Sequence, residues 1–362
     1  MKTTGINEKM WDMDPTMDTS QHLTVSEQQL NEAYHWLYQC RKHFPPNADI
    51  WVFRRDWNSY KINLLHQINR GDYLFSAVRR LYKRDGQVIH LWSSQDALVM
   101  KVLVDLLQPQ LSLSSSCTHI KGHGGLKQSV VRIQRYLDAY QFVCKTDVKH
   151  FYESIDQYLL IEQIYQHIDN KILRRYLYQV VRRTVEYGGN YQDITQGISR
   201  GCPLSPLLGA LYLKTLDKVF DTNTSYFYLR YMDDILILSK TRWQNRKAVR
   251  LLNQVFSELK IAQHPDKTFI GRIEKGFDFL GYHFSRKTLQ LADITVRKHV
   301  EHIVRLYEQQ MLKKVTLHEM TLILDHYVKR WQRWCTAGLS EFRQLLEIAC
   351  ENTQLNQAAL IP

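Results

Sequence analysis

Two adjacent carboxylates, Asp233 and Asp234, stand in the centre of a pattern that is typical of a β-hairpin. Strand-forming residues precede them at 226–229 and follow them at 235–238, so we expect the aspartates at the tip. Carboxylates that are held side by side repel each other unless a cation lies between them. The pair therefore predicts a site for Mg²⁺ or Mn²⁺, with an ordinary aspartate-rich turn as the alternative.

A third carboxylate, Asp147, lies 86 positions before Asp233, near the end of a predicted strand at 142–148. Between them, a loop rich in glycine, proline and serine at 197–204 leads into a predicted helix that starts at Ser205–Pro206. Phosphoryl transfer with two metal ions needs this kind of order, because carboxylates from separate strands must clamp both ions. One ion would activate an attacking 3′-oxygen and the other would hold a triphosphate.

Helical periodicity dominates both ends of the chain. We expect a helix from Glu27 to His43, and another whose capping box begins at Ser154. Near the C-terminus, Thr316 is expected to cap a last helix that ends near Gly338 and whose apolar stripe packs in the core. These helices must support the strands that carry the carboxylates.

This arrangement resembles the palm of reverse transcriptases over roughly residues 70–290. Residues 147–152 are similar to the family's first palm motif, which implies that Asp147 and the Val148 carbonyl are metal ligands. The resemblance puts Tyr152 under the sugar, where its ring would collide with a ribose 2′-hydroxyl and so favour deoxynucleotides. A core aromatic is the alternative for Tyr152.

The hairpin tip 231–234 resembles the family's signature tetrapeptide. The resemblance implies that Asp233 is a direct metal ligand and that Asp234 is a partial or more distant one. In 265–268 it implies Lys267 as the general acid that protonates the leaving pyrophosphate, with a surface lysine as the alternative. The implied cofactor is Mg²⁺ or Mn²⁺.

Two further motifs concern the nucleic acid. The loop before the helix resembles the segment that supports template and incoming nucleotide, but Arg200 stands before Gly201 where most relatives carry glutamine. Phe279, Leu280 and Gly281 match the hairpin that holds the primer end.

The fingers match the family less well. Lys83 and Arg84, which precede a glycine, are the candidate triphosphate contacts. Ile89 stands at the approximate place where relatives carry a triphosphate-binding arginine. Substrate binding in this part therefore departs from the family's pattern.

The bulk composition agrees with a polyanionic partner. The 362 residues carry a formal net charge of +12, which favours nucleic acid or an acidic membrane surface. No apolar run is long enough for a transmembrane helix, and the six scattered cysteines are typical of a reduced cytoplasmic protein. Cys117, His119 and His123 have a spacing that matches no standard zinc site, so we do not expect a metal there.

The sequence thus predicts an α+β protein with the right-hand polymerase architecture: fingers, an antiparallel-sheet palm with the paired-aspartate hairpin, and a helical thumb. The predicted division is a loose N-terminal leader at 1–25, N-terminal helices and fingers at 26–135, palm with fingers elements at 136–290, and a helical thumb and C-terminal region at 291–362.

The predicted activity is that of an RNA-directed DNA polymerase similar to bacterial reverse transcriptases of the group II intron, retron and stand-alone types. Its expected partners are an RNA template, a DNA or RNA primer and deoxynucleoside triphosphates, and no membrane. No nuclease, integrase or RNase H segment is recognisable, which favours a stand-alone protein that works with a dedicated non-coding RNA or an accessory protein, or in phage defence.

Three alternatives remain open. The same carboxylates would serve untemplated or protein-primed DNA synthesis, and the same fold would serve a catalytically silent RNA-binding or maturase-like scaffold. A viral RNA-dependent RNA polymerase is less favoured, because those enzymes usually carry glycine before the paired aspartates and lack an aromatic at the position of Tyr152.

Overall fold

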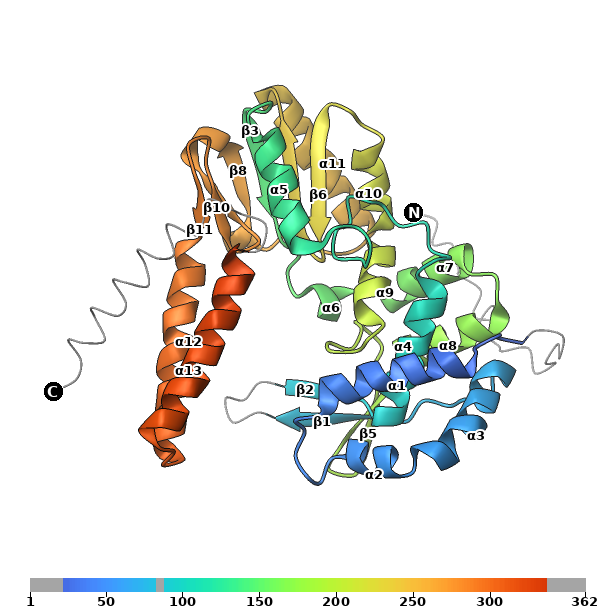
Figure 1. Ribbon diagram of the computed structural model, residues 1–362. Helices are drawn as coiled ribbons and strands as arrows, with labels where there is room; N and C mark the ends of the chain where they lie inside the picture. The colour runs from blue at the N-terminus through green and yellow to red at the C-terminus, as the bar shows by residue number, and fades with distance from the viewer. Residues whose placement is uncertain (1–21, 83–87, 337–362) are drawn as a thin grey trace. The chain divides into compact units, whose positions relative to one another are not determined.

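The computed structural model describes residues 22–82 and 88–336 of the chain (Figure 1). The chain forms two compact units, and each of them is built from two separate stretches of sequence. Unit 1 comprises Met1–Leu111 and Gln157–Ser205, and unit 2 comprises Ser112–Asp156 and Pro206–Pro362.

Unit 1 consists of helices around a small sheet. Its helices are α1 (Glu27–Arg41), α2 (Asp49–Arg55), α3 (Trp57–Arg70), α4 (Ser94–Leu107), α7 (Gln157–His167) and α8 (Lys171–Val181). Helix α1 begins with a capping box in which Ser26 and Gln29 each accept the other's backbone N–H. Helix α4 is apolar on most of its surface and is buried along nearly its whole length, so it forms the centre of this unit.

The sheet of unit 1 has the strand order β2-β1-β4-β5. Its strands are β1 (Val78–Tyr82), β2 (Val88–Leu91), β4 (Thr184–Tyr187) and β5 (Asn190–Asp193). The central pair, β1 and β4, is parallel, and the two outer pairs are antiparallel. A parallel pair needs a long crossover, and here the chain makes it by passing through unit 2 before it returns.

Unit 2 is built on an antiparallel sheet with the order β6-β7-β3-β8. Its strands are β3 (Phe142–Thr146), β6 (Tyr226–Tyr231), β7 (Asp234–Ser239) and β8 (Phe269–Arg272). Strands β3 and β7 are central, and every residue of β7 after Asp234 is buried. Asp147 directly follows β3 and Asp234 begins β7. Because these two central strands are antiparallel, both carboxylates lie at the same end of the strand pair.

Helices cover both faces of this sheet (Figure 1). They are α5 (Gly125–Leu137), α10 (Lys214–Asp221) and α11 (Arg242–Glu258). Helix α5 packs on the face that carries Val143, Leu236 and Leu238, whereas α11 packs on the opposite face of β3 and β7. Burial on both faces explains why β7 is apolar without alternation.

A second sheet, in the order β11-β10-β9, and two long helices complete unit 2. They are β9 (Phe277–Phe279), β10 (Tyr282–Phe284), β11 (Leu289–Leu291), α12 (Asp293–Leu312) and α13 (Leu317–Thr336), with 3₁₀ turns η2 (Pro265–Lys267) and η3 (Ile273–Lys275) before them. Thr316 and Glu319 form the expected cap of α13. Its stripe is only partly in the core, because Met320 is buried while Ile323 is exposed.

One predicted helix start differs from the structure. Ser154 does not cap a helix: it ends the short helix α6 (Phe151–Ser154), and α7 begins at Gln157. The Gln157 amide instead donates to the carbonyls of Val181 and Gly197, which removes it from the expected capping box. The helix predicted from Ser205 is α9 (Ser205–Tyr212), which ends before α10.

Candidate active site

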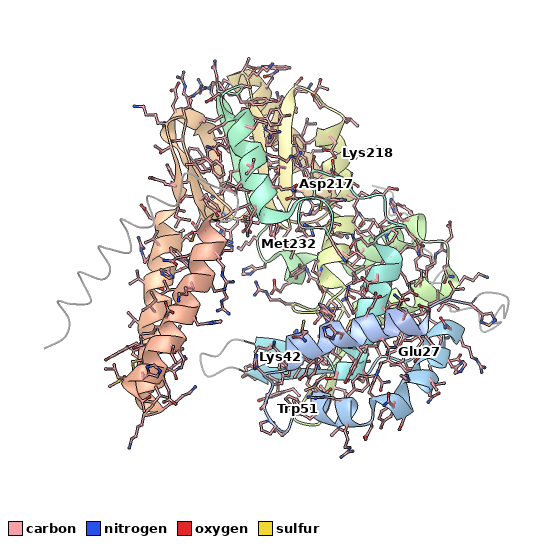
Figure 2. The ribbon with its side chains drawn as sticks, viewed as in Figure 1. Glu27, Lys42, Trp51, Asp217, Lys218 and Met232 are labelled. Atoms are coloured by element: carbon pink, nitrogen blue, oxygen red, sulfur yellow. The ribbon has the colours of Figure 1, made fainter. Side chains whose placement is uncertain are left out.

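The two aspartates lie at the tip of the β6–β7 hairpin, as the sequence pattern predicts. Tyr231 and Asp234 form the last pair of the ladder, so Met232 and Asp233 make a two-residue turn. Met232, labelled in Figure 2, has a φ of 57°, in the left-handed region that a residue with a long side chain rarely adopts. The backbone of the turn must therefore be held in place by its surroundings.

Asp147 is buried and stands beside a lysine. Its Oδ2 accepts a hydrogen bond from Lys267 Nζ at 2.6 Å, and its backbone carbonyl accepts one from the His264 N–H at 2.7 Å. The Lys267 side chain is 55% exposed, whereas that of Asp147 is only 9% exposed. Lys267 therefore reaches from the surface to the carboxylate, and this hydrogen bond raises the pKa of its ammonium group.

The three carboxylates influence one another. Burial, together with the nearby charges of Asp147 and Asp233, raises the pKa of Asp234 to about 7, against the opposing effect of Lys267 and Lys145. Lys145 lies on β3, and its own pKa is lowered by burial. The site thus concentrates negative charge at one end of the two central strands, with two ammonium groups beside it.

Three carboxylates that repel one another have the chemistry of a divalent-cation site, since hard cations prefer oxygen ligands. In the described part of the chain, however, no group of three or more His, Cys, Asp or Glu side chains converges as a set of metal ligands. In the structure, Lys267 supplies the positive charge next to Asp147. The donor types and their mutual repulsion fit Mg²⁺, and the arrangement around an ion is not defined by these side chains.

The chain after Asp147 brings an aromatic side chain to the hairpin tip. Val148 forms an isolated antiparallel bridge with Gln263. In this bridge the His264 N–H donates to the Asp147 carbonyl and the Lys149 N–H donates to the Ala262 carbonyl, so the Val148 carbonyl accepts neither of these two bonds. His150, with a φ of 48°, then turns the chain into α6. As a result, the hydroxyl of Tyr152 lies 3.9 Å from the Met232 sulfur.

A glycine on α9 makes room for this aromatic segment. A Cβ atom added at Gly209 would lie 2.9 Å from the Phe151 ring and 3.5 Å from the Tyr152 ring. The centroids of the Phe151 and Tyr152 rings are 5.4 Å apart. The position of Tyr152 therefore depends on the absence of a side chain at residue 209.

A buried ion pair, which sequence reasoning missed, supports the same hairpin. Arg230 on β6 and Asp217 on α10 are both fully buried and lie 2.5 Å apart, and the Tyr228 hydroxyl also donates to Asp217. Burial disfavours the charge on Arg230, but the Asp217 carboxylate more than offsets this and raises its pKa. Figure 2 labels Asp217 next to Lys218, which is exposed on the same helix. The one sign of this ion pair in the sequence is Arg230 itself, a basic residue inside an otherwise apolar predicted strand.

The predicted template loop belongs to unit 1. Arg200 is exposed and Gly201 has a φ of 81°, which is a conformation that favours glycine. Buried hydrogen bonds hold the loop, since Trp92 Nε1 donates to Ser199 Oγ and Arg183 donates to the Gly197 carbonyl. The loop is therefore anchored while Arg200 remains on the surface.

The predicted primer segment is a two-residue turn between β9 and β10. Leu280 and Gly281 have φ values of 51° and 86°, and Phe279 pairs with Tyr282. Phe279 is buried in the apolar core. The Gly281 carbonyl accepts hydrogen bonds from the N–H of Ala292 and the hydroxyl of Thr295, so this turn is tied to the start of α12.

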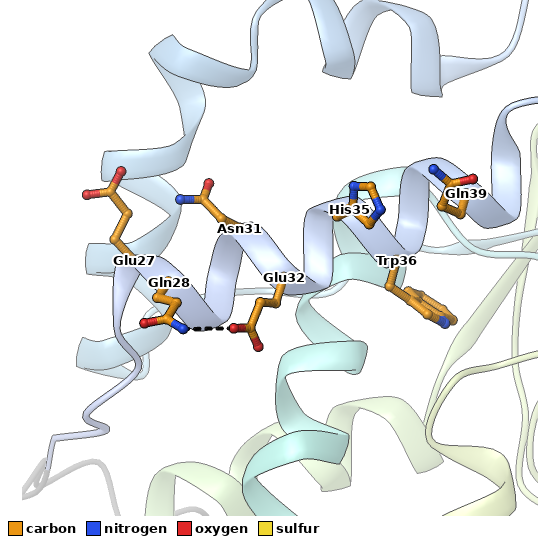
Figure 3. Close-up of a pocket in the computed structure, with 7 residues that line it drawn as sticks. All are labelled: Glu27, Gln28, Asn31, Glu32, His35, Trp36 and Gln39. Carbon is orange, nitrogen blue, oxygen red and sulfur yellow. Dashed lines mark hydrogen bonds between the residues drawn. The ribbon is translucent and has the colours of Figure 1, made fainter.

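Lys83 and Arg84, the candidate triphosphate contacts, lie outside the described residues. A separate shallow hollow lies along α1 (Figure 3). It is lined by Glu27, Gln28, Asn31, Glu32, His35, Trp36 and Gln39. Gln28 donates to Glu32 across its surface at 3.0 Å, and none of the candidate catalytic residues contributes to it. Among the described helices, none is long and apolar enough to cross a lipid bilayer.

Residues 87–284, more than half of the chain, match the family model described as reverse transcriptase (RNA-dependent DNA polymerase). No curated protein matches the chain.

Among solved structures, apo telomerase from Candida Tropicalis is similar at 12% identity with a TM-score of 0.46, over 65% of this chain and 52% of that chain. The same telomerase truncated from its C-terminal domain is similar at 13% identity with a TM-score of 0.45, over 60% and 54%. The chain spans about half the length of these telomerase chains, and a likeness of this degree establishes neither fold nor function.

Proposed function

The chain belongs to the family of reverse transcriptases, which are RNA-dependent DNA polymerases, and on this premise we propose that Asp147, Asp233 and Asp234 form its catalytic centre. The observation that carries the proposal is the crowding of negative charge around Asp234. Two neighbouring carboxylates add to burial in raising the pKa of Asp234 to about 7, next to the ammonium groups of Lys267 and Lys145. A site that crowds negative charge in this way is suited to bind a divalent cation.

We propose Mg²⁺, or Mn²⁺ in its place, as the cofactor, with Asp147, Asp233 and the Val148 carbonyl as ligands and Asp234 as a partial ligand. When bound, the ions would activate the 3′-oxygen of the primer and stabilise charge on the triphosphate. The carboxylates of Asp147 and Asp233 come from β3 and from the hairpin turn, so the sheet fixes their separation. This preorganisation is the protein's own contribution to the reaction.

Lys267 is the proposed general acid. In the reaction a bond forms between the primer 3′-oxygen and the α-phosphorus, the bond from that phosphorus to the bridging oxygen breaks, and pyrophosphate leaves. The raised pKa of Lys267 keeps a proton on Nζ, which the lysine can then give to the pyrophosphate oxygen. Its 55% exposed side chain leaves it free to turn from Asp147 toward a substrate.

Further roles follow for the residues that contact the substrates. We propose that Tyr152 selects deoxynucleotides and that Arg200 and Gly201 support the template and the incoming nucleotide. Lys83 and Arg84 would bind the triphosphate. Since Phe279 is buried, the half-buried Leu280 and Gly281 are the part of that turn suited to contact the primer end.

The proposed partners are an RNA template, a DNA or RNA primer and deoxynucleotides, together with a dedicated non-coding RNA or an accessory protein. The net charge of +12 supports polyanionic partners. The described cysteines are all free thiols, which supports a reducing compartment such as the cytoplasm. A stand-alone bacterial element of the retron or group II intron type, acting in phage defence, is the proposed biological setting.

Product sequencing tests the templated reaction. Purified protein with Mg²⁺, a primed RNA template of defined sequence and labelled deoxynucleotides should yield DNA complementary to that template. Products that match no RNA present would instead support untemplated or protein-primed synthesis. Equal inactivity of the wild type and of an Asp233→Ala, Asp234→Ala double variant on many templates would support the silent scaffold.

A further inference from the structure

The backbone of Met232 is held on both sides by side chains, one from a distant segment of unit 2 and one from β6 of the same hairpin. Its N–H donates to His119 Nδ1 at 3.0 Å, and its carbonyl accepts from Arg230 Nη1 at 2.7 Å. Met232 has a left-handed backbone conformation, so these two bonds offset a strain that the turn would otherwise relax. The next two residues in the chain are the proposed metal ligands.

The contacts of His119 define where its proton must be. The Met232 N–H can only donate, so Nδ1 must present its lone pair. Nε2 lies 3.1 Å from the Pro206 carbonyl, which can only accept, so Nε2 must carry the hydrogen. The neutral imidazole with its proton on Nε2 is therefore the only form of His119 that makes both bonds.

The surroundings of His119 keep it in this form. Burial, together with the charges of Arg230 and His123, lowers its pKa to about 4, although the hydrogen bond to the Pro206 carbonyl opposes this shift. The Cys117 sulfur lies 3.5 Å from Nδ1, where a thiol can donate weakly to the same lone pair. The imidazole thus remains neutral at the pH at which a polymerase works.

The segment that carries His119 is itself fastened to β6. The Arg230 N–H donates to the Ser116 carbonyl and the Thr118 N–H donates to the Arg230 carbonyl, both at 2.8 Å, in a short parallel bridge. At the other end of the imidazole, Pro206 belongs to the first turn of α9. His119 therefore joins the hairpin tip to the start of the helix that follows the template loop.

We infer that His119 is a positioning residue for DNA synthesis: its neutral imidazole fixes the Met232 peptide between the tip of the hairpin and α9, and so sets the direction of the Asp233 and Asp234 carboxylates. The inference rests on the proposed role of these aspartates. The spacing of Cys117, His119 and His123 predicts no metal site, and the structure assigns the first of these histidines to the turn.

Three substitutions separate the two bonds. His119→Asn keeps an acceptor near the position of Nδ1, His119→Gln keeps a donor near that of Nε2, and His119→Phe keeps only the ring. Since a misplacement of about 1 Å can cost on the order of 10²-fold in rate, we expect Gln and Phe to lower kcat by roughly 10- to 100-fold. Asn should retain kcat to within about threefold, because it can still accept from Met232.

The readouts distinguish positioning from folding. We expect the KM for deoxynucleotide to change little and the Mg²⁺ concentration that gives half-maximal rate to rise in the Gln and Phe variants. Ile133→Val, a fully buried change in α5 that does not touch the turn, serves as the stability control and should keep kcat and the Mg²⁺ midpoint. Activity of the wild type and its loss in Asp233→Ala establish first that the proposed function holds.

Equal kcat values in the wild type and all three His119 variants would overturn the inference, while the proposed function would stand. An Asn variant as slow as the Phe variant would overturn it as well. If the variants do not fold, nitrogen NMR of the wild type decides: we expect a neutral His119 with its proton on Nε2 at pH 7, and an imidazolium or a proton on Nδ1 would contradict the inference.

Discussion

At the scale of single residues, charge is distributed unequally around Asp147. Lys267 contacts its Oδ2 directly, whereas Lys145 acts on Asp234 from a neighbouring position in the sheet, and burial lowers the pKa of Lys145. Only the first of these lysines is largely exposed, and so only it can change partners during a reaction. The two lysines therefore have different roles, although both oppose the same negative charge.

Replacing Lys267 tests its role as general acid. We expect Lys267→Gln to lower kcat by about 10²- to 10⁴-fold, the usual contribution of a positioned acid, and Lys267→Arg to recover only part of this loss. Arginine keeps the charge beside Asp147 but gives up its proton too reluctantly. Single-turnover addition of one deoxynucleotide measures the effect.

Lys260 provides the control for this substitution, because its ammonium forms an exposed ion pair with Asp156 at 2.6 Å in the same unit. Lys260→Gln should leave the rate nearly unchanged. A Lys267→Gln variant as fast as Lys260→Gln would remove Lys267 from the chemistry.

The lowered pKa of His119 predicts that the free energy of unfolding depends on pH. Its pKa is lowered from 6.5 to about 4 in the folded protein, so between these values the unfolded chain binds more protons than the folded one. The stability from burying the neutral imidazole is therefore complete above about pH 6.5 and is lost as the pH falls toward 4. Urea unfolding of the wild type and of His119→Asn should show a stability difference that shrinks over this range; a difference independent of pH would contradict it.

The sequence predicted some of these residues and could not predict others. The three aspartates and Lys267 stand in recognisable patterns, and the structure brings all four into one electrostatic neighbourhood. Their catalytic roles remain predictions. His119 acts on the backbone of a turn 113 residues further along the chain, and no local pattern encodes such a contact.

At the scale of elements, the site depends on how α6 and α9 pack. Helix α6 has only four residues, so its position comes from its contacts and not from its own stability. Gly209 on α9 is the point where the two helices approach most closely, through the rings of Phe151 and Tyr152. The proposed selection of sugars by Tyr152 thus depends on this contact.

Gly209→Ala should disturb that contact. The new Cβ would lie 2.9 Å from the Phe151 ring, so we expect the free energy of unfolding to fall by about 1–3 kcal/mol, less the roughly 1 kcal/mol that alanine adds as a helix former. Ribonucleotide incorporation should rise as Tyr152 shifts. Phe151→Leu in the same chain should restore part of the stability, with a coupling energy of about 0.5–3 kcal/mol in the double-mutant cycle.

A stabilising Gly209→Ala with unchanged sugar preference would show that the Phe151 ring moves aside without cost. Tyr152→Ala, which removes the ring directly, gives the upper limit of the change in sugar preference.

Elements were predictable where local patterns decide them. The β6–β7 hairpin and the cap at Thr316 follow from residue type and spacing. The loss of the capping box at Ser154 follows from distant partners. Gln157, for example, is held by two carbonyls of unit 1, which the pattern of its neighbours does not reveal.

At the scale of the whole molecule, the α+β class is confirmed, and the sheet that carries the paired-aspartate hairpin is antiparallel throughout. The chain enters each compact unit twice, at 1–111 and 157–205 in one and at 112–156 and 206–362 in the other. Hydrophobic periodicity is a local property of the sequence, so it could not predict that each unit is built from two separate stretches of the chain. The division into leader, fingers, palm and thumb at 25, 135 and 290 remains a prediction.

The net charge of +12 predicts strongly salt-dependent binding of a primed RNA template. If six to ten phosphates are contacted, affinity should fall by roughly 10³- to 10⁵-fold between 50 and 200 mM salt. Fluorescence anisotropy with a labelled RNA–DNA hybrid measures the slope. The Asp233→Ala, Asp234→Ala variant should keep this slope, because its lesion is in the chemistry; affinity that is independent of salt would contradict a phosphate-binding surface.

The central claim, that Asp147, Asp233 and Asp234 catalyse DNA synthesis with a divalent cation, is tested most directly by one measurement. Single-turnover addition of one deoxynucleotide to a primer on RNA should be followed while Mg²⁺ is titrated, for the wild type and for Asp147→Asn, Asp233→Asn and Asp234→Asn. We predict a rate that requires Mg²⁺ and falls by at least about 10³-fold in Asp147→Asn and Asp233→Asn, with a smaller loss in Asp234→Asn. A wild-type rate that persists after removal of divalent ions, or asparagine variants as fast as the wild type, would contradict the claim.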